Sequence, residues 1–192
     1  MLFISGEAVF AAPLAPCVVG IGASAGGLEA LRVLVRLLPP GLGACCAVAQ
    51  HLSPTHRSML VELLARETSF RVVEIADGLV PEADCVYVTP ATCHVRFVGG
   101  AFRLEPASQA GIPKPSVDEF FGSLATAFEE RAVGVILSGT GSDGARGVRA
   151  IHSAGGCTLA QDPVEAKYDG MPQAAIESGC IDFVAGVAAL GP

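Results

Sequence analysis

The chain has 192 residues, of which 51% are hydrophobic and 16% charged, a composition that suits one compact domain with a large apolar core and excludes a disordered or fibrous protein. The formal net charge of −7, without any basic stripe, argues against nucleic acid as the main partner. No apolar segment is long enough to span a bilayer, so we expect no direct membrane insertion. The seven cysteines lack CxxC or metal-ligand spacing, which favours a reduced, cytoplasmic setting over a disulfide framework and predicts no metal site.

Residues 1–16 are apolar and rich in small side chains, as a signal peptide would be. They lack a basic start, however, and carry Glu7 inside the apolar run. We therefore expect an irregular leader, followed by a single domain over residues 17–192.

Hydrophobic periodicity downstream predicts strands and helices in alternation. The predicted strands are 17–22, 44–50, 71–76, 85–89, 131–139, 157–161 and 181–185. The predicted helices are 28–38, 53–67, 117–130, 144–155 and 170–179. Residues 94–105 predict a β-hairpin that turns at Gly99-Gly100, and a Pro/Gly/Ser-rich loop follows over 106–116.

This order predicts an α/β fold: a doubly wound, mostly parallel sheet flanked by helices, with a β-hairpin insertion near 94–105. In such sheets functional groups gather beyond the carboxyl ends of the strands. The loops that follow residues 22, 50 and 138 are therefore where we expect a site.

The first of these loops, in the stretch GIGASAGG, fits two motifs. Gly20-x-Gly22-x-x-Ala25 matches the dinucleotide fingerprint, which also requires an acidic residue at the end of the next strand. That strand ends in Gln50-His51, so the hypothesis of a nucleotide-binding domain lacks its second element.

The same stretch, as Gly22-x-Ser24-x-Gly26, matches the turn that exposes a serine nucleophile. A serine at the start of a helix is more often an N-cap, so this hypothesis needs a base and an acid from other loops. Ser24 is the candidate nucleophile.

His51 is the candidate base because it directly follows the second predicted strand. His56 is a rival that falls in the first turn of the next predicted helix. His94 begins the hairpin and His152 ends a helix, and the pattern places neither of them at the strand ends.

Asp143 is the candidate acid, since it follows the most hydrophobic strand and a Gly-rich loop. An aspartate there could equally be a helix N-cap, and Asp162, after the next strand, is the second choice. The amides of the loop Gly139-Thr140-Gly141 are candidates for an oxyanion hole. Ser24, His51 and Asp143 all follow strands, and that convergence predicts a Ser-His-Asp triad.

Several long motifs in register resemble the catalytic domain of the chemotaxis protein-glutamate methylesterases of the CheB type. These motifs are GIGASAGGLEAL (20–31), AQHLSP (49–54), DEFFGSLA (118–125), VILSGTGSDGARG (135–147), AQDP (160–163) and GMPQAAIESG (170–179). The resemblance covers residues 17–187 or so.

The resemblance implies hydrolysis of glutamate γ-methyl esters on the cytoplasmic helices of methyl-accepting chemotaxis receptors, with release of methanol and deamidation of receptor glutamines. It carries the family's triad onto Ser24, His51 and Asp143, and it implies no cofactor. A mainly amidase role and a non-catalytic receptor-binding module are the alternatives to the esterase.

Two departures from the family pattern stand out. Ala25 and Thr140 occupy positions where the family often has Thr and Met, both linked with oxyanion stabilisation. We also expect no receiver domain of the kind the family commonly carries, because residues 1–16 are too few to form one. The chain is expected to be a stand-alone enzyme, an excised domain, or part of a larger chain with a receiver or methyltransferase domain. Its sequence motifs are similar to those of methylesterase domains fused to receptor methyltransferases.

Overall fold

A seven-stranded sheet with strand order β3-β4-β2-β1-β7-β8-β9 forms the centre of the molecule, and every pairing in it is parallel. The computed structural model describes residues 17–51, 59–106 and 115–191. The strands of this sheet are β1 (Cys17–Ala23), β2 (Ala44–Gln50), β3 (Arg71–Glu74), β4 (Cys85–Val88), β7 (Val133–Ile136), β8 (Cys157–Gln161) and β9 (Phe183–Ala185).

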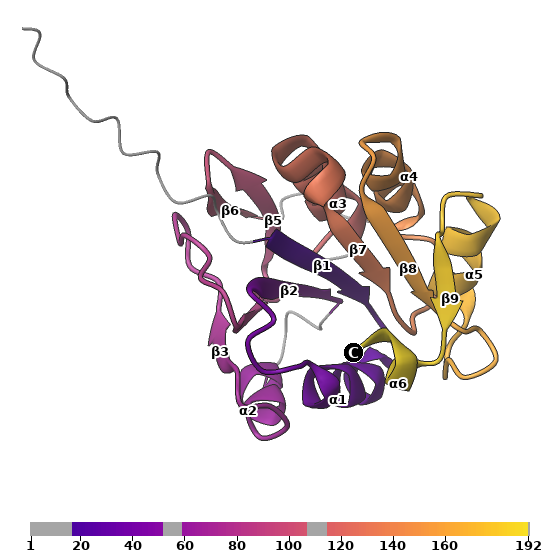
Figure 1. Ribbon diagram of the computed structural model, residues 1–192, viewed down its shortest axis with the longest axis horizontal. Coiled ribbons are helices and arrows are strands. Elements are labelled where there is room, and N and C mark those ends of the chain that lie inside the picture. The colour runs from indigo at the N-terminus through magenta and orange to yellow at the C-terminus, as the bar shows by residue number, and fades with distance from the viewer. Residues whose placement is uncertain (1–16, 52–58, 107–114, 192) are drawn as a thin grey trace, which may run out of the picture.

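Helices cover both faces of the sheet, which confirms the predicted doubly wound α/β fold (Figure 1). On one face lie α1 (Gly27–Leu37), α2 (Leu60–Ala65) and α6 (Val187–Leu190). On the other face lie α3 (Val117–Phe128), α4 (Ala145–Ser153) and α5 (Gly170–Glu177). No helix in the described part of the chain is long and apolar enough to cross a membrane.

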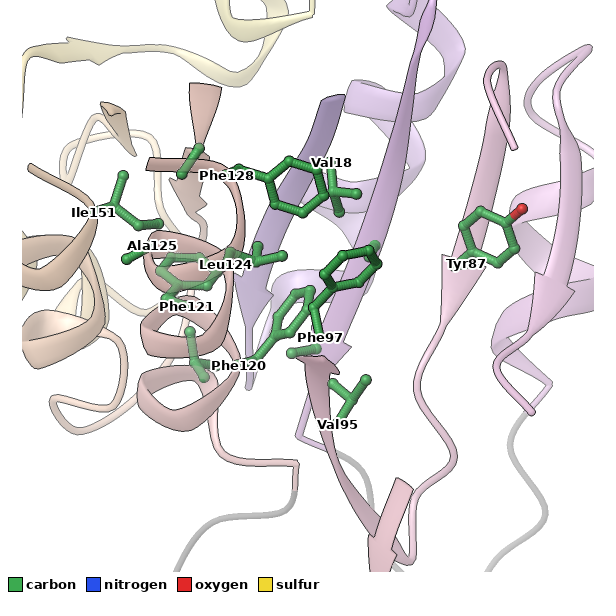
Figure 2. Close-up of a cluster of buried hydrophobic side chains, with 14 of the residues drawn as sticks. Val18, Tyr87, Val95, Phe97, Phe120, Phe121, Leu124, Ala125, Phe128 and Ile151 are labelled. Carbon is green, nitrogen blue, oxygen red and sulfur yellow. The ribbon is translucent and has the colours of Figure 1, made fainter. Parts of the chain in front are cut away.

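The predicted hairpin is also confirmed, as β5 (Cys93–Val98) pairs antiparallel with β6 (Ala101–Pro106). Gly99 and Gly100 both have positive φ angles, 62° and 83°, as a two-residue hairpin turn requires. The hairpin packs beside α3, where the rings of Phe97 and Phe128 lie 4.8 Å apart (Figure 2).

Some observed elements differ from the predicted ones. The strand predicted over 131–139 is shorter, because residues Glu129–Arg131 form a 3₁₀ turn before β7 begins at Val133. Helix α6 was not predicted, since four residues are too few to show helical periodicity. The start of the helix predicted over 53–67 lies outside the described residues.

Close packing of α3 against β1 explains two glycines of the opening stretch. A Cβ on Gly20 would lie 2.6 Å from Leu124 Cδ1, and one on Gly22 would lie 2.4 Å from Val117 Cγ1. Both glycines lie inside β1 beneath the helix, so they do not form the phosphate loop that the dinucleotide fingerprint requires. Their role is to let α3 approach the sheet and bring its N-terminus to the carboxyl ends of the strands.

Candidate active site

Ser24 and His51 follow directly on two neighbouring parallel strands. The register pairs Ala23 with Gln50, the last residues of β1 and β2. The residues that follow these two strands, Ser24 and His51, therefore lie side by side. The His51 amide continues this pattern by donating to the Ala23 carbonyl at 2.9 Å. The sequence-based expectation that both residues lie at one edge of the sheet is met.

Ser24 does not cap the helix that follows it. Helix α1 begins at Gly27, and its N-cap position is Gly26, which has a φ of 73° and makes no side-chain capping bond. The Ser24 amide donates to the Ser138 carbonyl at 3.0 Å, and the Ser24 carbonyl accepts from the Gly27 amide at 2.9 Å. The backbone of Ser24 is therefore fixed while its hydroxyl has no hydrogen-bond partner among the described residues.

His51 and Asp143 form a hydrogen-bonded pair, with 2.9 Å between Nε2 of the imidazole and Oδ2 of the carboxylate. The two side chains are 14% and 9% exposed. An ionised carboxylate only accepts, so Nε2 carries the proton that it donates and Nδ1 of the neutral ring keeps a lone pair. In this tautomer Nδ1 is the ring nitrogen that can accept a proton.

The N-terminus of α3 holds the Asp143 carboxylate. Oδ2 accepts from the Val117 amide and Oδ1 accepts from the Asp118 amide, both at 2.9 Å. Burial alone would raise the pKa of Asp143, but the hydrogen bonds from His51 and from these two amides outweigh it and lower the pKa below its usual value. The carboxylate therefore stays ionised beside the imidazole.

Asp143 does not cap its own helix, although its position just before α4 suggested that role. The N-cap of α4 is Gly144, with a φ of 101° and no side-chain capping bond. Instead Asp118, in the first turn of α3, accepts from the amides of Gly144 and Gly147 at 2.9 and 2.8 Å. Each aspartate caps the other's helix, and this reciprocal arrangement fixes Asp143.

The Gly-rich loop after β7 lies against Ser24. A Cβ on Gly139 would come within 2.9 Å of the Ser24 Cβ, so glycine is needed for the close approach. The Gly139 amide donates to the Tyr168 carbonyl at 3.0 Å and is not available to a ligand. Within the described part of the chain the amides of Ala25, Thr140 and Gly141 have no acceptor, and these three remain candidates for an oxyanion hole.

The other sequence candidates lie away from the pair or have structural partners. His56 lies outside the described residues. His94 is buried, and its Nδ1 accepts from the Ser116 amide at 3.0 Å. His152 lies in the last turn of α4, with its Nδ1 3.6 Å from the Asp182 carboxylate. Asp162 accepts from the Val164 amide within its own turn.

Three contributors to the site were not predicted from sequence: Asp118, Ser138 and Gln50. Asp118 was present only inside a family motif, and the one signal for Gln50 and its counterpart Gln161 is the dipeptide Ala-Gln at the ends of β2 and β8. Among the described residues no group of three His, Cys, Asp or Glu side chains could hold a metal ion.

The geometry suits nucleophilic catalysis at Ser24. Ser24 and His51 are not hydrogen bonded to each other here, and such contacts often tighten only when a substrate binds. Within the described residues the site brings together a serine whose hydroxyl has no partner, a hydrogen-bonded imidazole, a buried carboxylate and backbone amides without an acceptor. These are the groups that enzymes use to catalyse acyl transfer through a serine nucleophile.

Comparison with known proteins gives consistent matches. The family model described as CheB methylesterase matches residues 19–192. A solved structure, the CheB methylesterase catalytic domain of Thermotoga maritima, superposes with a TM-score of 0.86 at 28% identity, covering 92% of this chain and 95% of that one.

Curated relatives with similar sequences include proteins named as methylesterases of the same kind. A protein-glutamate methylesterase/protein-glutamine glutaminase of Anaeromyxobacter dehalogenans is 41% identical over 167 residues, which are 87% of this chain and 49% of that protein. One of Caulobacter vibrioides is 35% identical over 91% of this chain and 52% of its own length. An uncharacterized 104.1 kDa protein of Rhodobacter capsulatus is 45% identical over 69% of this chain but only 14% of its own length. The chain thus spans about half the length of the curated methylesterases it matches.

Proposed function

Because the chain belongs to the CheB methylesterase family, we propose that it hydrolyses glutamate γ-methyl esters on the cytoplasmic helices of methyl-accepting chemotaxis receptors and releases methanol. Residues 17–192 act as one catalytic domain in this proposal. The observation that carries it is the His51–Asp143 pair at 2.9 Å, directly beside Ser24 on the neighbouring strand end. Relatives named protein-glutamate methylesterase/protein-glutamine glutaminase support the same chemistry.

In the first half of the reaction, Ser24 Oγ attacks the ester carbonyl carbon and its proton passes to His51 Nδ1. Backbone amides stabilise the negative charge that develops on the carbonyl oxygen, and the candidate donors are the amides of Ala25, Thr140 and Gly141. The tetrahedral intermediate then breaks its bond to the methoxy oxygen. His51 returns the proton to that oxygen, and methanol leaves an acyl-serine behind.

In the second half a water molecule attacks the acyl-serine, with His51 again taking the proton. Collapse of this intermediate returns the proton to Ser24 Oγ and frees the receptor glutamate. Asp143 stays ionised throughout and stabilises the imidazolium that forms in each half. The free energy for the step comes from ester hydrolysis alone, and no cofactor is consumed.

Ala25 and Thr140 replace side chains that the family often has at these positions. Only their backbone amides are needed in the mechanism above, and an amide is present whatever the side chain. Deamidation of receptor glutamines follows the same steps, with ammonia as the leaving group in place of methanol. The word glutaminase in the names of the relatives supports this second activity.

Receptors whose methylated helices are cytoplasmic require a cytoplasmic enzyme, so that location is part of the proposal. A receiver or methyltransferase domain in a larger chain is the partner we propose for regulation. The match to 14% of a 104.1 kDa relative supports the occurrence of such a domain within a longer protein.

The test is methanol release from purified membranes that contain methylated receptors. Ser24→Ala is expected to abolish release while leaving the circular dichroism spectrum unchanged. His51→Gln is expected to do the same, whereas His56→Gln should keep most of the wild-type rate. Receptor binding by the wild-type protein without any methanol release would favour the non-catalytic binding module instead.

A further inference from the structure

Two buried glutamines occupy equivalent places in the sheet and begin a chain of hydrogen bonds across it. Gln50 ends β2 and Gln161 ends β8, and the two residues are 6% and 4% exposed. Gln161 Oε1 accepts from the Ser138 amide at 2.8 Å, and the Ser138 carbonyl accepts from the Ser24 amide at 3.0 Å. The Ser24 carbonyl in turn accepts from Gln50 Nε2 at 2.7 Å.

Gln50 also reaches the candidate base. Its Nε2 donates a second hydrogen bond, 3.2 Å long, to the carbonyl of His51. One amide group therefore ties the backbone of the candidate nucleophile to the backbone of the candidate base. No other side chain among the described residues makes hydrogen bonds to both.

The carbonyl that Gln50 holds belongs to the same peptide unit as the Ala25 amide. A peptide unit is planar and trans, so its C=O and N–H point in opposite directions. Fixing the Ser24 carbonyl toward Gln50 therefore fixes the direction of the Ala25 N–H, which is one of the candidate oxyanion donors named above. Hydrogen bonds accepted by the carbonyl also polarise the unit and make its N–H a stronger donor.

The second candidate donor is oriented in the same way. The Gly139 carbonyl accepts from the Met171 amide at 2.8 Å, at the start of α5, and the Thr140 N–H belongs to that peptide unit. For the Thr140 unit the partner is the backbone amide of Met171, which among single substitutions only proline would remove. The Ser24 carbonyl of the Ala25 unit also accepts from a backbone amide, that of Gly27, but it has a side-chain partner as well, Gln50, which can be replaced.

We propose that Gln50 is a positioning residue that aims the Ala25 amide at the developing oxyanion and holds Ser24 in register with His51. The inference rests on the proposed function, since it concerns the reaction of Ser24. Gln50 touches neither the substrate nor the reacting atoms and acts through the Ser24–Ala25 peptide unit.

The other end of the Gln50 amide indicates that its donor side is what matters. Gln50 Oε1 is buried and has no hydrogen-bond partner in the described part of the chain, which is unfavourable for an acceptor. It lies over Gly27, where an added Cβ would be only 2.6 Å away. The amide group is thus buried, and only its Nε2 is hydrogen bonded within the described residues.

Gln50→Met keeps the length of the side chain and removes the donor. We expect kcat to fall about 100-fold, the size of effect that a small misplacement of catalytic groups produces, with KM changed less than about twofold. The rate at which a fluorophosphonate labels Ser24 should fall in parallel, because that reaction also needs the oxyanion hole.

Gln50→Glu keeps the shape and makes the effect depend on pH. A protonated carboxyl can donate to the Ser24 carbonyl, whereas an ionised one cannot. Burial beside two carbonyl oxygens raises the pKa of the introduced group, so the ratio of variant to wild-type kcat should fall as the pH rises from about 5 to 8. Gln50→Met should show no such trend, and dividing by the wild-type rate removes any pH dependence that the two proteins share.

Thr158→Val is the matched control for lost stability. Thr158 is fully buried near the amino end of β8, away from the site, and its hydroxyl lies within hydrogen-bond distance of two acceptors, the Cys180 carbonyl and the Asp182 carboxylate. It should lower the melting temperature but leave kcat and labelling unchanged.

The outcomes separate the two proposals. Wild-type protein that is not labelled at Ser24 and releases no methanol would refute the proposed function. Normal labelling and turnover in Gln50→Met, or a flat pH ratio for Gln50→Glu at reduced activity, would refute the role of Gln50 while the proposed function stands. Should Gln50→Met not fold, the pH ratio of Gln50→Glu decides alone.

Discussion

Asp143→Asn is the substitution whose effect follows most directly from the geometry. The carboxylate accepts three hydrogen bonds, from His51 Nε2, the Val117 amide and the Asp118 amide. An asparagine has one acceptor oxygen in place of two, so its NH₂ group must face at least one of these N–H donors. At least one buried donor then loses its partner, and the negative charge at the N-terminus of α3 is lost.

The cost in stability can be worked from these contacts. A hydrogen bond to a charged group contributes about 1.5–3 kcal/mol, and a negative charge at a helix N-terminus contributes roughly 0.3–1 kcal/mol more. We therefore expect the free energy of unfolding to fall by about 2–4 kcal/mol, measured by urea denaturation. With the side chain only 9% exposed, solvent screening reduces this little.

The cost in activity should be larger than the loss of stability implies. An asparagine cannot stabilise the imidazolium and favours the wrong tautomer of His51, an effect that lowers kcat about 10⁴-fold in the serine proteases for which it is known. The assay is methanol release at a temperature where circular dichroism shows the variant folded.

Asp182→Asn is the control for this substitution. Asp182 also accepts from a backbone amide, that of Thr158 at 2.8 Å, and also faces a histidine, His152, yet it lies outside the site. This variant should lose stability and keep its activity. The assignment of the triad would be refuted if Asp143→Asn retained more than about a tenth of the wild-type kcat, since a triad aspartate is worth far more than that.

Three further predictions follow from neighbouring contacts. The pKa of Asp143 is lowered in the folded chain, so the ionised carboxylate stabilises the fold fully above its unfolded pKa of about 3.9, and this stabilisation is lost as the pH falls through the lower folded pKa. The difference in unfolding free energy between wild type and Asp143→Asn should therefore shrink in acid. A difference that stays constant with pH would contradict this. Asp118→Ala should free the Gly144 end of α4, displace Asp143 and lower kcat about 100-fold without changing KM, and an unchanged kcat would show that the reciprocal caps are dispensable. Gly20→Ala should lower the free energy of unfolding by about 1–3 kcal/mol, because its Cβ meets Leu124, and a neutral result in urea denaturation would mean that α3 can move away from β1.

The sequence determined the alternation of strands and helices, because local hydrophobic periodicity survives in the folded chain. It also placed Ser24, His51 and Asp143 after three strands, which is sufficient to bring them to one edge of a parallel sheet. The hairpin turn at Gly99-Gly100 was equally readable, since backbone conformation there depends only on the two glycines.

The tertiary structure decided what each residue does at that edge, because hydrogen bonds between distant segments leave no local pattern. Asp143, which the sequence presented as a possible cap for its own helix, caps α3 instead, and Asp118 returns the cap to α4. The glycines of β1 make room for α3 and do not cradle a phosphate. In the sequence, Gln50 was noted only because it stands where a dinucleotide site would have an acidic residue. In the folded chain it donates to the carbonyls of both Ser24 and His51, since only the packed sheet places its amide between two neighbouring loops.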